Sequence, residues 1–398
     1  MADVNLTIRP QSFKLSHVWR TSIQNAYNGN EKRTMLYTWP RVILDVEYIL
    51  SQNDRINWFK RNLIQKDTLT WAAPIWSDET TLTSQAASGQ KILAVGSTDT
   101  RHFYNGRQCI IISASSFLSY EIGTIASFTS TEITLVDNLV STWGAGSIVA
   151  PWYDFRLEDE QEIGALFQKL QKIELKLTEE FKTLRTFSYT VPASAAPTYL
   201  TYDLFLYKAA NPIQYNYKRP YEGGQFLGLG YYTDQFASGK NLLKMKTSLV
   251  RTSRADIWSL LSFFDSKMGR FNPFWIPTWS KDIIATTAIL SSDTIINIED
   301  ISYTTFYLLN EIIGRYVYIR FPNSTYVCRK ITDASASTIT LSSAIGTAVA
   351  LADLSNLLIS FLMLCRFDID TIEIDYQTKT FATSDLFFAG LLDNTIIT

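Results

Sequence analysis

Acidic side chains gather in two segments of the sequence, and paired carboxylates are what a glycosidase or a calcium site would need. One group opens the segment from Glu158 to Lys172, and the other alternates from Asp368 to Asp375. A glycosidase places two acids across one cleft. Acids at the start of a helix instead suit its dipole, and alternating acids suit the exposed face of a strand. No EF-hand loop frames either group, so both are predicted to be solvated faces.

The other residue types that support catalysis or metal binding are sparse. His17 and His102 have no metal-ligand spacing, and a structural or surface role is predicted for both. Cys109, Cys328 and Cys365 are dispersed, so neither a disulfide framework nor an iron–sulfur cluster is predicted. The glycine-rich stretch from Gly223 to Tyr232 lacks the strand-to-helix context of a phosphate-binding loop. These patterns predict no cofactor, no metal and no enzymatic activity.

Two aromatic-proline-tryptophan segments remain as candidates for binding. They read "WAAPIW" and "FNPFWIPTW", and they align at Trp71, Pro74 and Trp76 with Phe274, Pro277 and Trp279. An aromatic cleft could hold a sugar or a peptide, but proline also fixes its own φ and keeps its predecessor extended. Two copies at one place favour a stiff turn in each half. Trp76 and Trp279 are therefore predicted to be buried at equivalent joints.

Further segments align in the same order and indicate an internal duplication. The aligned pairs are Gly106 with Gly314, Ile133 with Ile339, Arg156 with Arg366, and "KIELKL" with "TIEIDY". The first copy is predicted to be 1–190 and the second 191–398. The Pro/Ala/Ser-rich stretch "YTVPASAAPTY" would be the linker between them.

The alternating, β-branched and aromatic segments predict a mainly β protein built as two tandem domains. Each would be a sheet or barrel with a short helix and an inserted small β-barrel module, at about 80–150 and 283–362. Ser253 and Gly269 would cap the helix of the second copy, and the matching helix would start at Asn53 or Asp54. An extra helix is predicted at about 158–172.

Length and composition narrow the function. The chain has 398 residues, which suits two or three domains, and a formal net charge of −2 with no basic stripe. Nucleic-acid binding is therefore not expected. The most apolar run, Leu354 to Cys365, is too short for a membrane-spanning helix and is predicted to be a buried strand. Aromatic residues make up 14% of the chain, which suits large protein interfaces.

Three segments resemble the tail-tip proteins of long-tailed bacteriophages, of the distal-tail and baseplate-hub kind. The segment "GNEKRTMLYTWPRVILDVEYI" is similar to their Gly-x-Glu-x-Arg…Pro-Arg strand segment. The predicted second helix followed by "GRFNPFWIPTW" is similar to their Gly-Arg…Phe-Trp-x-Pro segment. The first module ends in Gly-x-x-Val-x-Pro, from Gly146 to Pro151, as their small β-module does. The second copy lacks this closing Gly and Pro, and the first copy lacks the Gly-Arg.

The resemblance implies a structural protein of the virion tail that forms a ring between the tail tube and the hub or baseplate. Two similar domains in one chain would give a homotrimer with pseudo-sixfold symmetry, and a homohexamer is the next choice. Its other partners would be the tail tube protein and hub, tail fibre or tape-measure proteins. The alternatives are a carbohydrate-binding adhesin on the host surface and a tail-associated hydrolase.

Overall fold

The computed structural model describes most of the chain. The described residues are 4–25, 30–51, 53–64, 70–116, 118–158, 161–167, 170–180, 191–192, 194–210, 213–218, 221–226, 229–234, 242–307 and 314–391. The protein is mainly β, as predicted, with large antiparallel sheets and few helices. Among these residues, no helix has the length and apolar character needed to cross a membrane.

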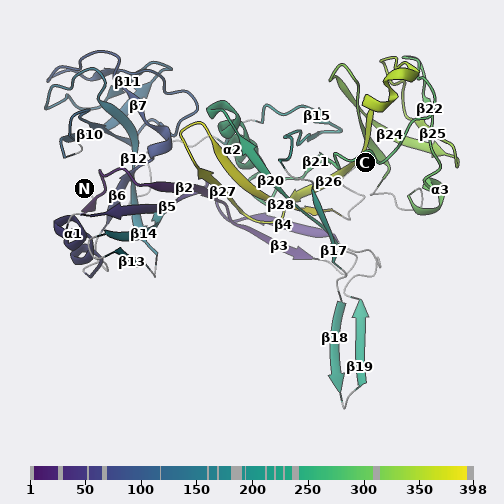
Figure 1. The fold of residues 1–398 in the computed structure, drawn as a ribbon, viewed down its shortest axis with the longest axis horizontal. Helices are drawn as coiled ribbons and strands as arrows, with labels where there is room; N and C mark the ends of the chain where they lie inside the picture. The colour runs from purple at the N-terminus through teal and green to yellow at the C-terminus, as the bar shows by residue number, and fades with distance from the viewer. Residues whose placement is uncertain are drawn as a thin grey trace.

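One continuous antiparallel sheet runs through the middle of the molecule (Figure 1). Its strands follow the order β13-β14-β5-β2-β27-β28-β20-β17. The first half supplies β13 (Glu162–Phe167), β14 (Leu170–Glu179), β5 (Arg41–Leu50) and β2 (Ser12–Val18). The second half supplies β27 (Thr371–Tyr376), β28 (Ala382–Gly390), β20 (Leu242–Arg251) and β17 (Gln214–Lys218).

Alternating side chains give this sheet one buried and one solvated face. In β5, Val42, Leu44, Val46 and Tyr48 are buried, whereas Asp45 and Glu47 between them are half-buried. The buried face forms the main core with helices α1 (Asn53–Ile64) and α2 (Arg254–Lys267). Burial of this apolar face fixes the register, because a slip of one residue would turn every apolar side chain to solvent.

The ends of α2 are fixed as the sequence predicts. Ser253 is the N-cap, and its Oγ accepts a hydrogen bond from the Asp256 amide at 3.1 Å. Met268 and Gly269 at the other end have left-handed φ of 53° and 63°. A Cβ on Gly269 would lie 2.6 Å from Asp370 Oδ1, so glycine is needed there for space as well as for φ.

A smaller β-module rises from each half, and the two modules lie at opposite ends of the molecule (Figure 1). The first contains β6 (Trp71–Pro74), η2 (Trp76–Asp78), β7 (Thr80–Thr81), β8 (Ile92–Ala94), β9 (Gln108–Ile112), β10 (Tyr120–Phe128), β11 (Glu132–Leu135) and β12 (Ile148–Leu157). The second contains β21 (Phe274–Pro277), β22 (Ile295–Asn297), α3 (Tyr303–Phe306), β23 (Tyr316–Arg320), β24 (Tyr326–Ala334), β25 (Thr338–Leu341), η3 (Leu351–Asn356) and β26 (Leu358–Phe367). Each module has a core of its own. The apolar run predicted to be a buried strand supplies most of β26.

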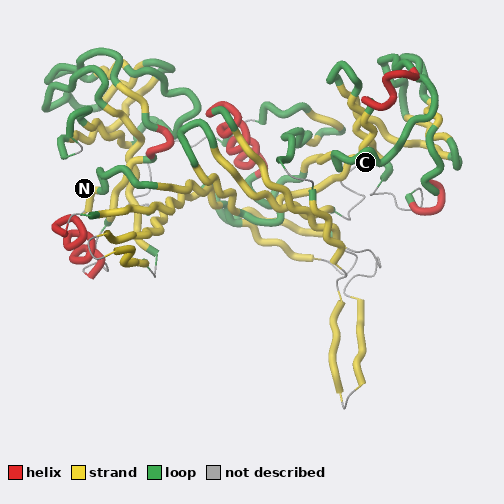
Figure 2. Tube along the Cα trace, in the orientation of Figure 1, coloured by secondary structure: helices red, strands yellow, loops and turns green. Residues whose placement is uncertain are grey.

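Two hairpins leave the central sheet at matching places. β3 (Thr21–Asn25) and β4 (Glu31–Met35) follow β2, whereas β18 (Tyr221–Phe226) and β19 (Leu229–Asp234) follow β17. The first hairpin lies along the sheet, and the second projects away from it (Figure 2). The short strands are β1 (Val4–Asn5), β15 (Thr198–Tyr199) and β16 (Tyr202–Asp203).

Both halves use the same ladder of strand pairs. Trp71 lies opposite Phe155 in the β6–β12 pair, and Phe274 lies opposite Cys365 in the β21–β26 pair. The register shifts between Ile125 and Ser127 in the β10–β11 pair and again between Ile331 and Asp333 in the β24–β25 pair. A repeated bulge is expected when two domains share one architecture. This ladder supports the duplication, and the common origin of the halves stays a prediction.

Two expectations about the end of the first half are wrong. The extra helix at about 158–172 is instead the β13–β14 hairpin, with 159–160 and 168–169 outside the described residues. Ile173, Leu175 and Leu177 of β14 alternate into the core and pair with β5, which overrides the helix-like spacing before them. The second expectation was that "KIELKL" in β14 aligns with "TIEIDY" in β27. The strand pairing instead places β27 at the position of β13, and it places β28 at the position of β14.

Candidate functional site

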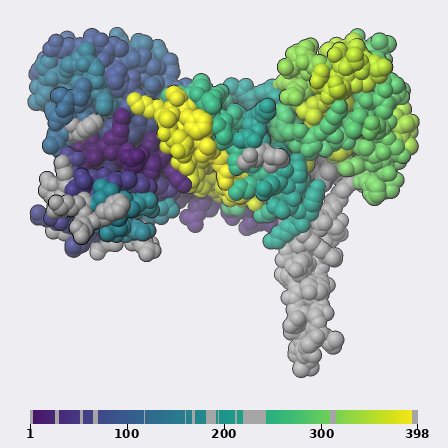
Figure 3. All heavy atoms as spheres, viewed as in Figure 1, coloured from purple at the N-terminus to yellow at the C-terminus, as the bar shows by residue number. Residues whose placement is uncertain are grey.

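The two halves meet where β2 pairs with β27. The pairing runs from Phe13 opposite Tyr376 to Val18 opposite Thr371, and Leu15 and Ile374 at its centre are fully buried. The space-filling view shows N-terminal residues in purple directly against C-terminal residues in yellow (Figure 3). In the order across the sheet, β2 is the last strand of the first four-strand unit and β27 is the first strand of the second unit. The contact is therefore head to tail.

The β3–β4 hairpin of the first half strengthens this junction by binding the second half. Both carboxylate oxygens of Glu31 accept hydrogen bonds of 2.7 Å from Nε and Nη2 of Arg366. The Arg366 side chain is only 8% exposed, so this bidentate pair is shielded from water. Arg33 from the same hairpin donates to the Phe271 carbonyl at 2.7 Å.

The turn after α2 completes the contact. The Thr21 amide donates to Asp370 Oδ2 at 2.7 Å, and Arg270 donates to the Thr21 carbonyl at 2.8 Å. The Arg270 amide also donates to Asp370 Oδ1 at 2.9 Å. Glu31 and Arg33 belong to the segment "GNEKRTMLYTWPRVILDVEYI", and Arg270 belongs to "GRFNPFWIPTW". The fold thus brings two segments that are distant in the sequence into one interface.

A buried polar cluster ties the first module to α2 beside this junction. His17 Nε2 and His102 Nε2 are 2.9 Å apart, and His17 Nδ1 is 2.9 Å from Asp265 on α2. His102 Nδ1 contacts Asp78, whose other oxygen accepts a 2.5 Å hydrogen bond from Arg254. The two histidines and the two aspartates of the cluster are each less than 5% exposed. Both histidines are buried rather than on the surface, and their pairing had no sequence signal.

The geometry of the cluster sets its proton count. Each Nδ1 faces a carboxylate and must donate, and the contact between the two Nε2 atoms needs one more proton, so the imidazole pair carries one positive charge. Burial alone would lower the pKa of His17, but the Asp265 carboxylate raises it above its usual value. Burial and the charge of His17 hold the pKa of His102 below its usual value, despite Asp78. His17 therefore carries the charge, and with Arg254 it balances Asp78 and Asp265.

Burial of Asp78 alone would raise its carboxyl pKa, but the neighbouring His102 and Arg254 and a hydrogen bond from Ser77 lower it. Asp78 is thus ionised although it is fully buried. A buried charge of this kind persists only where its partners stay in place. The cluster therefore orients the first module against α2.

The aromatic-proline-tryptophan segments do not form one site. Trp71 and Phe274 are fully buried in the main core, and Pro74 and Pro277 are buried beside them. Trp76 is buried in a small cluster of its own. The prediction for Trp279 was wrong: it is half-buried over Tyr318, with ring centroids 5.5 Å apart. Its φ of 58° is left-handed, so the backbone is not extended at this residue.

The other aligned residues keep matching places but have different surroundings. Gly106 and Gly314 both adopt left-handed turns, with φ of 81° and 83°, before β9 and β23. Arg156 and Arg366 lie at the same position of β12 and β26. The Arg156 side chain is 74% exposed and pairs with Glu180 at 2.7 Å, whereas Arg366 is covered by the β3–β4 hairpin.

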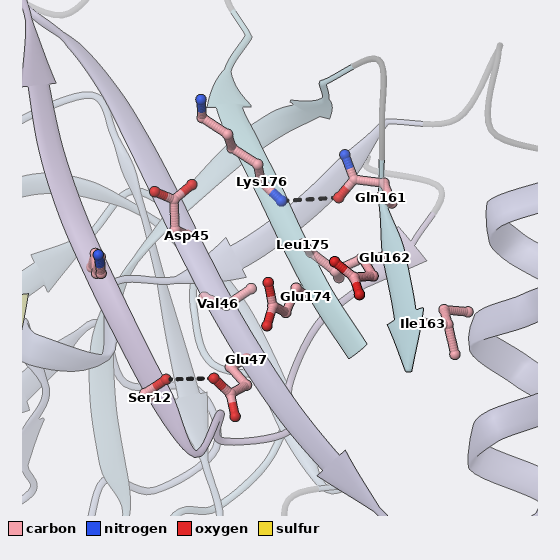
Figure 4. Close-up of a pocket in the computed structure, with 11 residues that line it drawn as sticks. Ser12, Asp45, Val46, Glu47, Gln161, Glu162, Ile163, Glu174, Leu175 and Lys176 are labelled. Atoms are coloured by element: carbon pink, nitrogen blue, oxygen red, sulfur yellow. Dashed lines mark hydrogen bonds between the residues drawn. The ribbon is translucent and has the colours of Figure 1, made fainter. Parts of the chain in front are cut away.

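The solvated face of the first-half sheet contains an open hollow of about 750 Å³ (Figure 4). Its polar lining includes Asp45, Glu47, Glu162 and Glu174. Lys172 lies 3.1 Å from Glu47 and 2.6 Å from Glu174, so these acids are bridged across strands. The described lining contains no histidine or cysteine. Of the acids predicted to lie on solvated faces, Glu162 lines this open face. The prediction was wrong for Asp370, whose side chain is only 13% exposed and pairs with Arg270 at the junction.

Within the described parts of the chain, no group of three or more His, Cys, Asp or Glu residues is placed to hold a metal ion. In comparisons with protein-family models and with curated proteins, the sequence matches none of them. The junction between the halves is the strongest candidate functional site, because it gathers a shielded ion pair and the buried cluster.

Proposed function

We propose that the protein is a structural component of a bacteriophage tail tip that forms a ring between the tail tube and the hub or baseplate. The observation that carries this proposal is the head-to-tail pairing of β2 with β27. It joins two four-strand units with the same ladder through two different surfaces. Contacts of this heterologous kind generate closed rings when the rotation between units closes.

The residues of the junction add support. Glu31, Arg33 and Arg270, which the two family-like segments contribute, make hydrogen bonds across it. A chain that already contains two units would complete a sixfold arrangement with three copies. We propose a homotrimer with pseudo-sixfold symmetry, with a homohexamer as the next choice. The tail tube and hub, tail fibre or tape-measure proteins would be its neighbours in the virion.

Mass photometry of the purified chain tests the ring. Three copies of the 45.3 kDa chain should form the dominant species at micromolar concentration. A reconstruction computed without imposed symmetry should then show two similar but distinct lobes repeated around one axis. A stable monomer under these conditions would contradict the proposal. Antibody labelling of intact virions should mark the tail tip, and label elsewhere on the particle would argue for another component.

A further inference from the structure

We propose that the ring closes by pairing the free edge of β17 in one copy with the free edge of β13 in the next copy. This inference rests on the proposed ring and names the surfaces that form it. Among the described residues, β17 pairs with β20 alone and β13 with β14 alone. Within the described part of the chain, the sheet thus ends at β17 on one side and at β13 on the other, and the outer backbone groups of each have no partner strand there.

These two edges are the counterparts of the strands that pair at the centre of the sheet. β17 holds the position of β2, because Tyr215 lies opposite Met245 as Leu15 lies opposite Leu44. β13 holds the position of β27, because β13 forms a hairpin with β14 as β27 forms one with β28. Pairing β17 with β13 of another copy would therefore repeat a contact that the chain already makes.

The residues along both edges suit this contact. Ile213, Tyr215 and Ile163 are half-buried and pack against the rim of the main core, as buried Leu15 and Ile374 pack within it. Transferring the β2–β27 register places Tyr215 opposite Ile163 and Asn216 opposite Glu162. An unprotected edge of this kind is a template for another strand.

Arg156 gives a second, independent indication of the same contact. The β3–β4 hairpin that follows β2 covers Arg366 in the second half, leaving it 8% exposed, whereas Arg156 in the first half is 74% exposed. β18–β19 is the hairpin that follows β17, and it projects from the molecule (Figure 1). In the proposed ring, this hairpin of one copy lies over the Arg156 region of the next.

Cysteine cross-linking tests both the partner and the register. Asn216→Cys and Glu162→Cys would lie directly opposite, about 4.5–5.5 Å apart between Cβ atoms, which mild oxidation can close to a disulfide. The matched control is Gln214→Cys with Glu162→Cys, a diagonal pair about 7–8 Å apart. Asn216, Gln214 and Glu162 are all exposed, so the folded core is unaffected. The native cysteines are all buried and do not compete.

With both cysteines in one chain, oxidation should yield covalent dimers and a covalent trimer, and no larger species. A mixture of the two single variants should stop at dimers, because each interface contains one residue of each kind. The control pair should lose most of this cross-linking. Mass photometry on the reduced variants separates the possible failures. Trimers without the Asn216–Glu162 cross-link would overturn this pairing and leave the ring standing, whereas monomers would overturn both.

Discussion

Arg366 and Arg156 hold the same ladder position in two similar units, but they have opposite surroundings. Arg366 is held by Glu31 under a hairpin from the neighbouring unit, whereas Arg156 lies in water beside Glu180. The two units therefore have similar strand pairing, but different parts of the chain cover them. Burial at this position is a property of the junction between units.

The modules differ in a similar way. Asp78 of the first module is fully buried and bound by Arg254 from α2. At the matching position, the second module has Lys281, which is exposed and donates to the Leu354 carbonyl at 3.1 Å. At this position the first module thus binds the other half of the chain through Asp78, whereas Lys281 bonds within the second module. The resulting asymmetry distinguishes the two lobes that a ring of such chains would display.

The largest expected effects come from the aromatic residues shared by both units. Trp71→Ala and Phe274→Ala should each lower the free energy of unfolding by about 3–5 kcal/mol, because each leaves a large cavity in the same core. Urea unfolding followed by circular dichroism measures the loss. Trp279→Ala is the control, and its half-buried ring should cost less than either. A negligible cost at Trp71 alone would break the equivalence of the two units.

Arg366→Ala should cost about 3 kcal/mol, because it leaves the Glu31 carboxylate unpaired in a shielded place. The same substitution at Arg156 should cost less than about 1 kcal/mol in a dissociated chain, since an exposed ion pair contributes little. Unfolding of both variants at low protein concentration gives the comparison. Equal costs would mean that the β3–β4 hairpin does not stabilise the junction.

The smallest expected effect is the pH dependence of the buried histidines. The raised pKa of His17 gives stability that is present below about pH 6.5 and is lost as pH rises through the folded value. The lowered pKa of His102 gives stability that is present above about pH 6.5 and is lost as pH falls through its folded value. Stability should therefore be greatest between the two folded pKa values.

The measurement compares unfolding of the unmodified chain with His17→Gln from about pH 5 to about pH 9. The advantage of the unmodified chain should shrink at high pH by at most about 1.4 kcal/mol per pH unit for one proton. The charged groups that face the pair are Asp265, Asp78, Glu179 and Arg254. An advantage that does not change with pH would mean that folding does not raise the pKa of His17.

Local patterns in the sequence predicted much of the fold. The alternation in "KIELKL" and "TIEIDY" and the cap at Ser253 all report on a residue's near neighbours, and the structure confirms them. The predicted helix at about 158–172 failed because pairing of β14 with β5, which lies far away in the sequence, decided its conformation.

The candidate site was harder to predict, because it depends on contacts between distant segments. Glu31 was singled out as part of a family-like segment and Arg366 as an aligned residue, but nothing in their spacing indicated that they bind each other. His17 and His102 come together only when the first module, β2 and α2 are all in place. Trp76 and Trp279 were both expected to be buried because their segments align, but Trp279 has a left-handed φ of 58° and is only half-buried.

The pairing of β2 with β27 also constrains how the chain is made. Residues 12–18 leave the ribosome long before residues 371–376 exist to pair with them. During that interval β2 would be an open edge carrying Phe13 and Leu15, and such an edge favours pairing with the wrong strand. Contacts between residues so far apart in the sequence also form slowly. Synthesis of this protein would therefore be most sensitive to aggregation between completion of the first half and release of the second.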